Sequence, residues 1–160
     1  MSGINELEKK AEAAHLQYRK QLRAVIMKVP VPFLITPKGM IPQKSTVDYT
    51  GVIAGGKFIA FDAKETLSKT SFPMANIHQH QYIYLKYTQQ LGGISFFMIH
   101  FKTVFPDQVF IVPLKLIDKY MDINATAKSI KLAEFSTHWL THIDSYLDHV
   151  IEVQDELKEQ

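Results

Sequence analysis

The sequence contains no cysteine, so disulfide bonds, thiolate zinc sites and a cysteine nucleophile are all excluded. It also lacks any apolar run of the roughly 18 to 20 residues that a membrane-spanning helix needs. The longest candidate, Ile94 to Phe101, has the length of a strand. Met1 to Glu6 open into a charged helical pattern, without the apolar segment of a signal peptide. These absences predict a cytoplasmic protein with no membrane segment.

The composition is that of an ordinary globular chain, but its charges are unevenly distributed. The 160 residues, 46% of them hydrophobic, suit one domain that spans 1–160 and buries a core. The net charge is only +2. Up to Lys86 there are 12 Lys and Arg against 6 Asp and Glu, and beyond it 6 against 10. A basic half and an acidic half favour one face that meets a polyanion such as nucleic acid.

The spacing of hydrophobic residues predicts a mixed α/β sandwich whose central β-sheet is flanked by helices and buried on both faces. Helices are predicted over 6–22, 74–90 and 114–120 and in one or two pieces after 129. Strands are predicted over 24–27, 47–53, 58–63, 94–101 and 108–112. The prolines within 30–37 predict an extended, poorly paired connection, and 66–73 is predicted to be a polar loop.

Three charged residues on two neighbouring strands are the chemically informative feature. Asp62 and Lys64 are two positions apart on a predicted strand, so their side chains share one face of the sheet. Whether Asp48 joins them depends on the hairpin register. A two-residue glycine turn would set Asp48 opposite Ala63, on the wrong face, whereas a three-residue loop of 54–56 would set it opposite Asp62.

Two carboxylates and the backbone carbonyl of Ala63 would form a hard oxygen site suited to Mg²⁺ or Mn²⁺. Such an ion lowers the pKa of a bound water and neutralises charge on a phosphodiester, and Lys64 would orient that water or stabilise the phosphate. Alternatively, Asp48 caps a turn while Asp62 and Lys64 form a solvated pair. The functional interpretation is favoured because both charges interrupt the apolar run Phe58–Phe61.

Four ordered blocks of the sequence match a known family. They are Thr46–Val52, Phe61–Thr66, Lys69–Pro73 and Asn76–Gln81. Together they resemble the RecU family of Holliday-junction resolvases, which have the PD-(D/E)xK, restriction-endonuclease-like fold. The resemblance is specific because it rests on four blocks in order, and it continues more faintly toward Asp144.

The resemblance implies that Asp48 and Asp62 are metal ligands, that Lys64 is the catalytic lysine, and that Mg²⁺ is the cofactor, with Mn²⁺ as a substitute. The family usually has glutamate at the position of Asp62, and aspartate keeps the charge with a shorter reach. Gln81 stands where related nucleases carry a glutamine that supports the active site.

Such nucleases often take a further acid from the first helix. Glu8 is the candidate here, and Glu12, one turn later on the same side, is the alternative.

The resemblance also implies a structure-selective endonuclease that acts on branched DNA as a homodimer, because a four-way junction is nearly two-fold symmetric and needs paired nicks. The segment 31–45 would be a short counterpart of the stalk that enters the junction in the family. The candidate DNA contacts are Lys38, Lys44, Thr46, Lys69, Thr70 and Ser71. Two alternatives remain: another DNA nuclease of this fold, of restriction or repair type, and a non-catalytic DNA-binding module.

Overall fold

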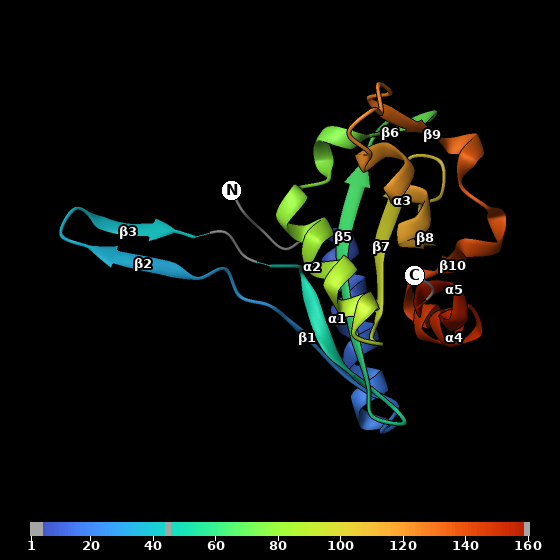
Figure 1. The fold of residues 1–160 in the computed structure, drawn as a ribbon. Helices are drawn as coiled ribbons and strands as arrows, with labels where there is room; N and C mark the ends of the chain where they lie inside the picture. The colour runs from blue at the N-terminus through green and yellow to red at the C-terminus, as the bar shows by residue number, and fades with distance from the viewer. Residues whose placement is uncertain (1–4, 44–45, 159–160) are drawn as a thin grey trace.

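The computed structural model describes residues 5–43 and 46–158, and a six-stranded mixed sheet lies at its centre (Figure 1). The strand order is β1-β4-β5-β7-β8-β10. These strands are β1 (Ala24–Lys28), β4 (Tyr49–Ile53), β5 (Lys57–Thr66), β7 (Ile94–Phe101), β8 (Gln108–Val112) and β10 (Leu140–His142). In this sheet β5 and β7 run parallel, and the other neighbouring pairs are antiparallel.

Helices contribute to a core on each face of the sheet. On one side lie α1 (Glu6–Lys20), α4 (Tyr146–Glu152) and α5 (Gln154–Lys158), and on the other lie α2 (Gln79–Gln90) and α3 (Leu114–Met121). Strand β7 is buried throughout: Phe96 and Met98 belong to the first core, Phe97 and Ile99 to the second. The predicted fold class, a mixed central sheet flanked by helices, is therefore confirmed.

Helix α1 follows the pattern expected from its sequence. Its N-cap Asn5 accepts a hydrogen bond from the backbone N–H of Glu8 at 2.7 Å, acidic residues occupy the first turn, and basic residues occupy the last. Its buried stripe is Leu7, Ala11, Ala14, His15 and Tyr18. Of the helices within 5–43 and 46–158, none combines the length and apolarity that crossing a membrane requires.

Three predicted segments are corrected by the structure. The predicted loop 66–73 ends in β6 (Ser71–Pro73), which pairs with β9 (Ser129–Lys131), so 129–131 is not helical. The predicted helix 74–90 divides into a 3₁₀ turn, η1 (Met74–Asn76), and α2, because the backbone of Ile77 is extended. Between β9 and α4 the chain forms the short turns η2 (Leu132–Glu134), η3 (Thr137–Trp139) and η4 (Ile143–Ser145), with β10 among them. Tertiary pairing overrides helical spacing in these short segments.

The prediction of a poorly paired connection from Pro30 through Lys44 is wrong for its middle. Strand β2 (Phe33–Thr36) pairs antiparallel with β3 (Gly39–Pro42), and this hairpin projects away from the sheet (Figure 1). Pro37 lies in the turn, where its fixed φ is favourable, and Gly39 has a φ of 124°. The prolines therefore limit the hairpin at its turn and ends without preventing it.

Stacked aromatic rings join three central strands on the α1 side. The rings of Tyr49, Phe61 and Phe96 stack in a row, with centroids 4.9 and 4.8 Å apart. His15 of α1 meets Tyr49 edge-on at 5.1 Å, and its Nε2 lies 2.6 Å from the hydroxyl of Tyr146. Burial lowers the pKa of His15 from 6.5 to about 4, so the ring is neutral at pH 7.

We expect His15 to make the protein less stable in acid. Between pH 6.5 and pH 4 the unfolded chain binds a proton that the folded protein does not, so this contribution is complete above pH 6.5 and is lost as the pH falls toward 4. Urea unfolding at pH 7.5 and pH 5 should show that the free energy of unfolding of the wild type, relative to His15→Gln, falls by about 2 kcal/mol at the lower pH. The exposed control His142→Gln should keep the pH dependence of the wild type. An identical pH dependence in the wild type and His15→Gln would contradict this assignment.

Candidate active site

The register of the hairpin between β4 and β5 determines which residues share a face. Ile53 pairs with Lys57, so residues 54–56 form a three-residue loop in which both glycines have positive φ (94° and 78°). The last pair of this ladder is Tyr49 with Phe61. The same register, extended by one residue, sets Asp48 opposite Asp62. Of the two registers open from the sequence, the structure has the one that brings the two carboxylates together.

Four polar side chains then form one connected cluster. The backbone N–H of Asp48 donates to Asp62 Oδ1 at 3.0 Å, and the N–H of Ala63 donates to Asp48 Oδ2 at 2.9 Å. Lys64 Nζ lies 2.9 Å from Asp62 Oδ2. Gln81 of α2 connects both partners, because its Nε2 donates to Asp62 Oδ1 at 3.0 Å and its Oε1 accepts from Lys64 Nζ at 2.9 Å. The structure thus brings together the residues that the sequence predicted.

The electrostatics of this cluster favour an added positive charge. Asp62 is fully buried, and its pKa is raised from 3.8 to about 7, first by burial and then by the negative charge of Asp48, with Lys64 acting in the opposite direction. Its Oδ2 atom makes the ion pair with Lys64 but accepts no hydrogen bond of good geometry from the described part of the chain. Two facing carboxylates with an unsatisfied oxygen fit a hard divalent cation.

The protein supplies few charged ligands for such an ion. Within 5–43 and 46–158 no group of three or more His, Cys, Asp or Glu side chains is arranged to hold a metal. The site would therefore depend on Asp48 and Asp62 together with other oxygens, and the carbonyl of Ala63 stays a predicted ligand.

A cavity of about 440 Å³ lies at this cluster, and Asp48, Ala63 and Lys64 form part of its wall. The first turn of α1, the turn before α2, and Tyr49 and Glu65 of the sheet form the remainder. Five of its polar lining residues were not predicted from the sequence: Asn5, Tyr49, Glu65, Asn76 and His78. Four of them lie inside the matched blocks, and that position was the available signal. Asn5 was recognisable as a helix cap.

The two candidate acids of α1 differ in position. Glu8 lines the cavity and forms an ion pair with Lys28 of β1. Glu12 is exposed and borders a different hollow, beside Arg19 and Met27. The geometry favours Glu8 as the acid nearer the cluster, and its role as a metal ligand stays a prediction.

The candidate DNA contacts do not form one group. Those within the described residues are Lys38, Thr46, Lys69, Thr70 and Ser71, and Lys44 lies outside them. Lys38 stands at the tip of the β2–β3 hairpin, whereas 69–71 lead into β6 (Figure 1). Ser68 Oγ accepts the backbone N–H groups of Thr70 and Ser71 at 3.3 and 3.1 Å, which orders this loop internally. A role in DNA binding stays a prediction for all six.

A mixed sheet that carries two carboxylates and a lysine at one surface is what the resemblance to PD-(D/E)xK nucleases predicts. The family model "RecU: Recombination protein U" matches residues 3–158, and the chain belongs to this family. Proteins named Holliday junction resolvase RecU are 41% identical over 142 residues in Staphylococcus epidermidis and 39% identical over 140 residues in Shouchella clausii.

Both matches cover 80% of this chain and about two thirds of the relative, 67% and 66% respectively. Among solved structures, the Holliday junction resolvase Hjc of Archaeoglobus fulgidus aligns with a TM-score of 0.45 at 11% identity. That alignment covers 85% of this chain and 98% of Hjc.

We expect the buried carboxylate to cost stability. Because the folded-state pKa of Asp62 is raised, the folded protein binds more protons than the unfolded chain between pH 3.8 and 7, and stability falls as the pH rises through this window. In EDTA at pH 8, Asp62→Asn should therefore raise the free energy of unfolding by on the order of 2 to 4 kcal/mol. Urea unfolding measures this, with the exposed Asp122→Asn as the control. A less stable Asp62→Asn variant at pH 8 would refute the electrostatic account.

Proposed function

We propose that this protein is a metal-dependent DNA endonuclease that resolves four-way (Holliday) junctions by paired nicks in recombination and repair. The observation that carries the proposal is the connected cluster of Asp48, Asp62, Lys64 and Gln81 in a chain of the RecU family. The curated relatives that it matches are named Holliday junction resolvases, and the chain spans about two thirds of their length. A single nuclease domain over 1–160 and a cytoplasmic location belong to the same proposal.

In the proposed mechanism, Asp48 and Asp62, with the carbonyl of Ala63, would hold Mg²⁺, or Mn²⁺ in its place. When bound, the ion supplies a water of lowered pKa and neutralises charge on the phosphodiester. Lys64 provides a point charge beside the reacting phosphate and can orient the attacking water. Gln81 holds both Lys64 and Asp62 before the substrate arrives, so these groups need little reorganisation.

Cleavage should depend on the two carboxylates while DNA binding should not. Asp48→Asn and Asp62→Ala should each lower the rate of junction cleavage by about 10²-fold or more. Binding should be unchanged or tighter, because a carboxylate that repels phosphate is removed. The assay compares labelled four-way junction, fork and linear duplex side by side with Mg²⁺, and Asp122→Asn serves as the control.

The same assay separates the alternatives. Mg²⁺ and Mn²⁺ should support cleavage, and Ca²⁺ should support binding without turnover. Equal cleavage of duplex and junction would favour another nuclease of this fold. Binding without cleavage in the wild type would favour a non-catalytic module, and full activity in excess EDTA would exclude the mechanism.

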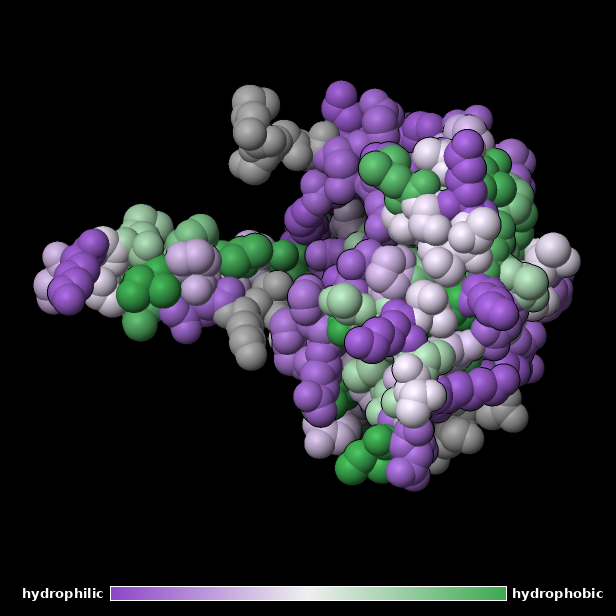
Figure 2. Space-filling view, turned by 90° about the horizontal axis from the view of Figure 1, so that it is seen from above, coloured by the Kyte–Doolittle hydropathy of each residue, from purple (hydrophilic) through white to green (hydrophobic). Residues whose placement is uncertain are grey.

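The β2–β3 hairpin suits the proposed contact with the open centre of a junction. Figure 2 shows hydrophobic residues gathered along this projection. Its large apolar side chains are about half exposed or more: Phe33, Leu34, Ile35, Met40 and Ile41. Apolar side chains that project into solvent beside Lys38 match a place where bases are exposed and phosphates crowd together.

The cross-strand pair Ile35 and Met40 allows a sharp test, because these side chains are 81% and 62% exposed and their loss leaves the hairpin ladder intact. The double variant Ile35→Ser with Met40→Ser should weaken junction binding several-fold and should leave nicking of duplex unchanged. Ile123→Ser, at a position 97% exposed and outside the hairpin, is the control. Unchanged junction affinity and selectivity in the double variant would remove the hairpin from recognition.

An apolar strip on the sheet fits the proposed homodimer. Val25, Val52 and Phe58 are successive cross-strand partners on β1, β4 and β5, so they lie in one row on one face. Phe58 is four positions from Asp62 on β5, so this is the face that carries the carboxylates. All three are 40–49% exposed, and β1 is the edge strand of the sheet. A two-fold partner on this strip would bury it beside both active sites.

We expect Val52→Arg to convert the dimer into a monomer, because it places a charge at the centre of the strip. Sedimentation at micromolar concentration measures the effect, and Ile123→Arg should leave the dimer intact. A wild-type monomer that still makes paired junction nicks would contradict the dimer, and a dimeric Val52→Arg would exclude this surface.

A further inference from the structure

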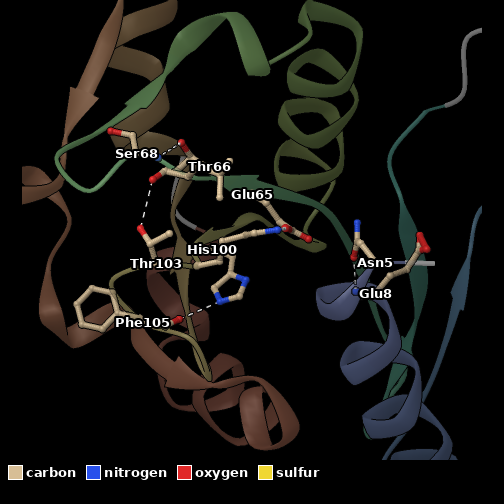
Figure 3. A network of polar contacts seen from close by, with 10 residues as sticks. Asn5, Glu8, Glu65, Thr66, Ser68, His100, Thr103 and Phe105 are labelled. Atoms are coloured by element: carbon tan, nitrogen blue, oxygen red, sulfur yellow. Dashed lines mark hydrogen bonds and ion pairs between the residues drawn. The ribbon is translucent and has the colours of Figure 1, made fainter. Parts of the chain in front are cut away.

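A second group of polar side chains lies on the opposite face of the same strands. Glu65 of β5 and His100 of β7 are cross-strand partners, so their side chains share a face. Glu65 and His100 lie on the face of the sheet that packs against α1, to which Ala63 also contributes. Asp62 lies on the other face, where it contacts Gln81 of α2. Figure 3 shows Glu65 and His100 on neighbouring strands near the first turn of α1, where Asn5 and Glu8 lie.

The tautomer of His100 follows from its hydrogen bond. The ring is 4% exposed, and its Nε2 lies 2.9 Å from the carbonyl oxygen of Phe105. A carbonyl only accepts, so Nε2 carries the proton. Burial lowers the pKa of His100, which keeps the ring neutral. Its Nδ1 therefore has a free lone pair, and this buried atom has no hydrogen-bond partner in the described part of the chain.

Glu65 offers a second unsatisfied acceptor beside it. Oε2 of Glu65 lies 2.9 Å from Lys102 Nζ, but Oε1 is buried without a hydrogen-bond partner among residues 5–43 and 46–158. Glu65 also lines the cavity, which gives this carboxylate a path to solvent. Two acceptors cannot satisfy each other, so the pair needs a donor or a cation between them.

We propose that Glu65 and His100 form a second cation site, which takes a divalent transition-metal ion such as Zn²⁺ in preference to Mg²⁺. An imidazole nitrogen with a carboxylate oxygen is a donor set that Zn²⁺ accepts, whereas Mg²⁺ demands oxygen ligands. Water fills the remaining positions, since only two protein ligands are present. Lys102 neutralises one carboxylate oxygen, so the ion is held moderately and exchanges with solvent.

The position of the site gives it a structural consequence. Just beyond the pair, the backbone N–H of Lys102 donates to the carbonyl of Thr66 at 3.3 Å, and Thr103 Oγ1 donates to the carbonyl of Leu67 at 3.2 Å (Figure 3). These contacts join the ends of β5 and β7 where the loop toward β6 begins. A cation between Glu65 and His100 cross-links the same two ends and steadies the strand that carries Lys64.

Calorimetric titration of the full chain with Zn²⁺, in excess Mg²⁺, tests the site. We expect one binding event that weakens at least about tenfold in Glu65→Gln and in His100→Gln. It should be unchanged in Asp62→Asn and in the exposed-histidine control His142→Gln. Circular dichroism checks folding, and Glu65→Gln keeps an oxygen that can accept from Lys102, so at least one variant stays native.

Three results would overturn the proposal: no Zn²⁺ binding by the wild type, unchanged binding in Glu65→Gln and His100→Gln, or loss of binding in Asp62→Asn. The first means that a water donor alone satisfies the two acceptors. The readout is ion binding and not DNA cleavage, so its failure leaves the proposed nuclease function untouched.

Discussion

The reciprocal hydrogen bonds between the backbone and the carboxylates of Asp48 and Asp62 are the constraint on which the site depends. Each aspartate accepts an N–H from the neighbouring strand, which locks the two carboxylates in place. The pairing exists only because three residues, 54–56, separate the paired positions of the hairpin. A loop shorter by one residue would turn Asp48 to the other face, since side chains alternate along a strand. The length of this loop, in which both glycines have positive φ, therefore decides whether the cluster forms.

The cluster places the carboxylate of Asp62 in an environment that disfavours its charged form. Asp62 is fully buried beside another acid, and Lys64 and Gln81 offset only part of the cost, as the raised pKa of Asp62 indicates. On the opposite face the strands are joined by the stacked rings of Tyr49 and Phe61 and packed against α1. A rigid aromatic layer behind a strained polar surface keeps the charged groups in position without help from the substrate.

On the face of the sheet that carries the carboxylates, a helix covers the central strands and leaves the strands at one edge exposed. Helix α2 covers β5 and β7 and brings Gln81 to the cluster, whereas β1 and β4 leave Val25 and Val52 exposed. The projecting hairpin joins these same strands, with its apolar residues in solvent. Exposed apolar surface on both elements is consistent with the two proposed contacts, another copy of the chain at the strip and DNA bases at the hairpin.

Local patterns in the sequence were sufficient for the long elements. Helix α1 was recognisable by its apolar spacing, β7 by its apolar run, and Asp62 with Lys64 by the charges that interrupt a buried strand. Tertiary structure alone decided what depends on distant partners: the register that brings Asp48 to Asp62, the pairing of β6 with β9, and the meeting of Glu65 with His100. Periodicity reports which face of an element is apolar, but contacts between segments far apart in the chain are determined by packing of the whole molecule.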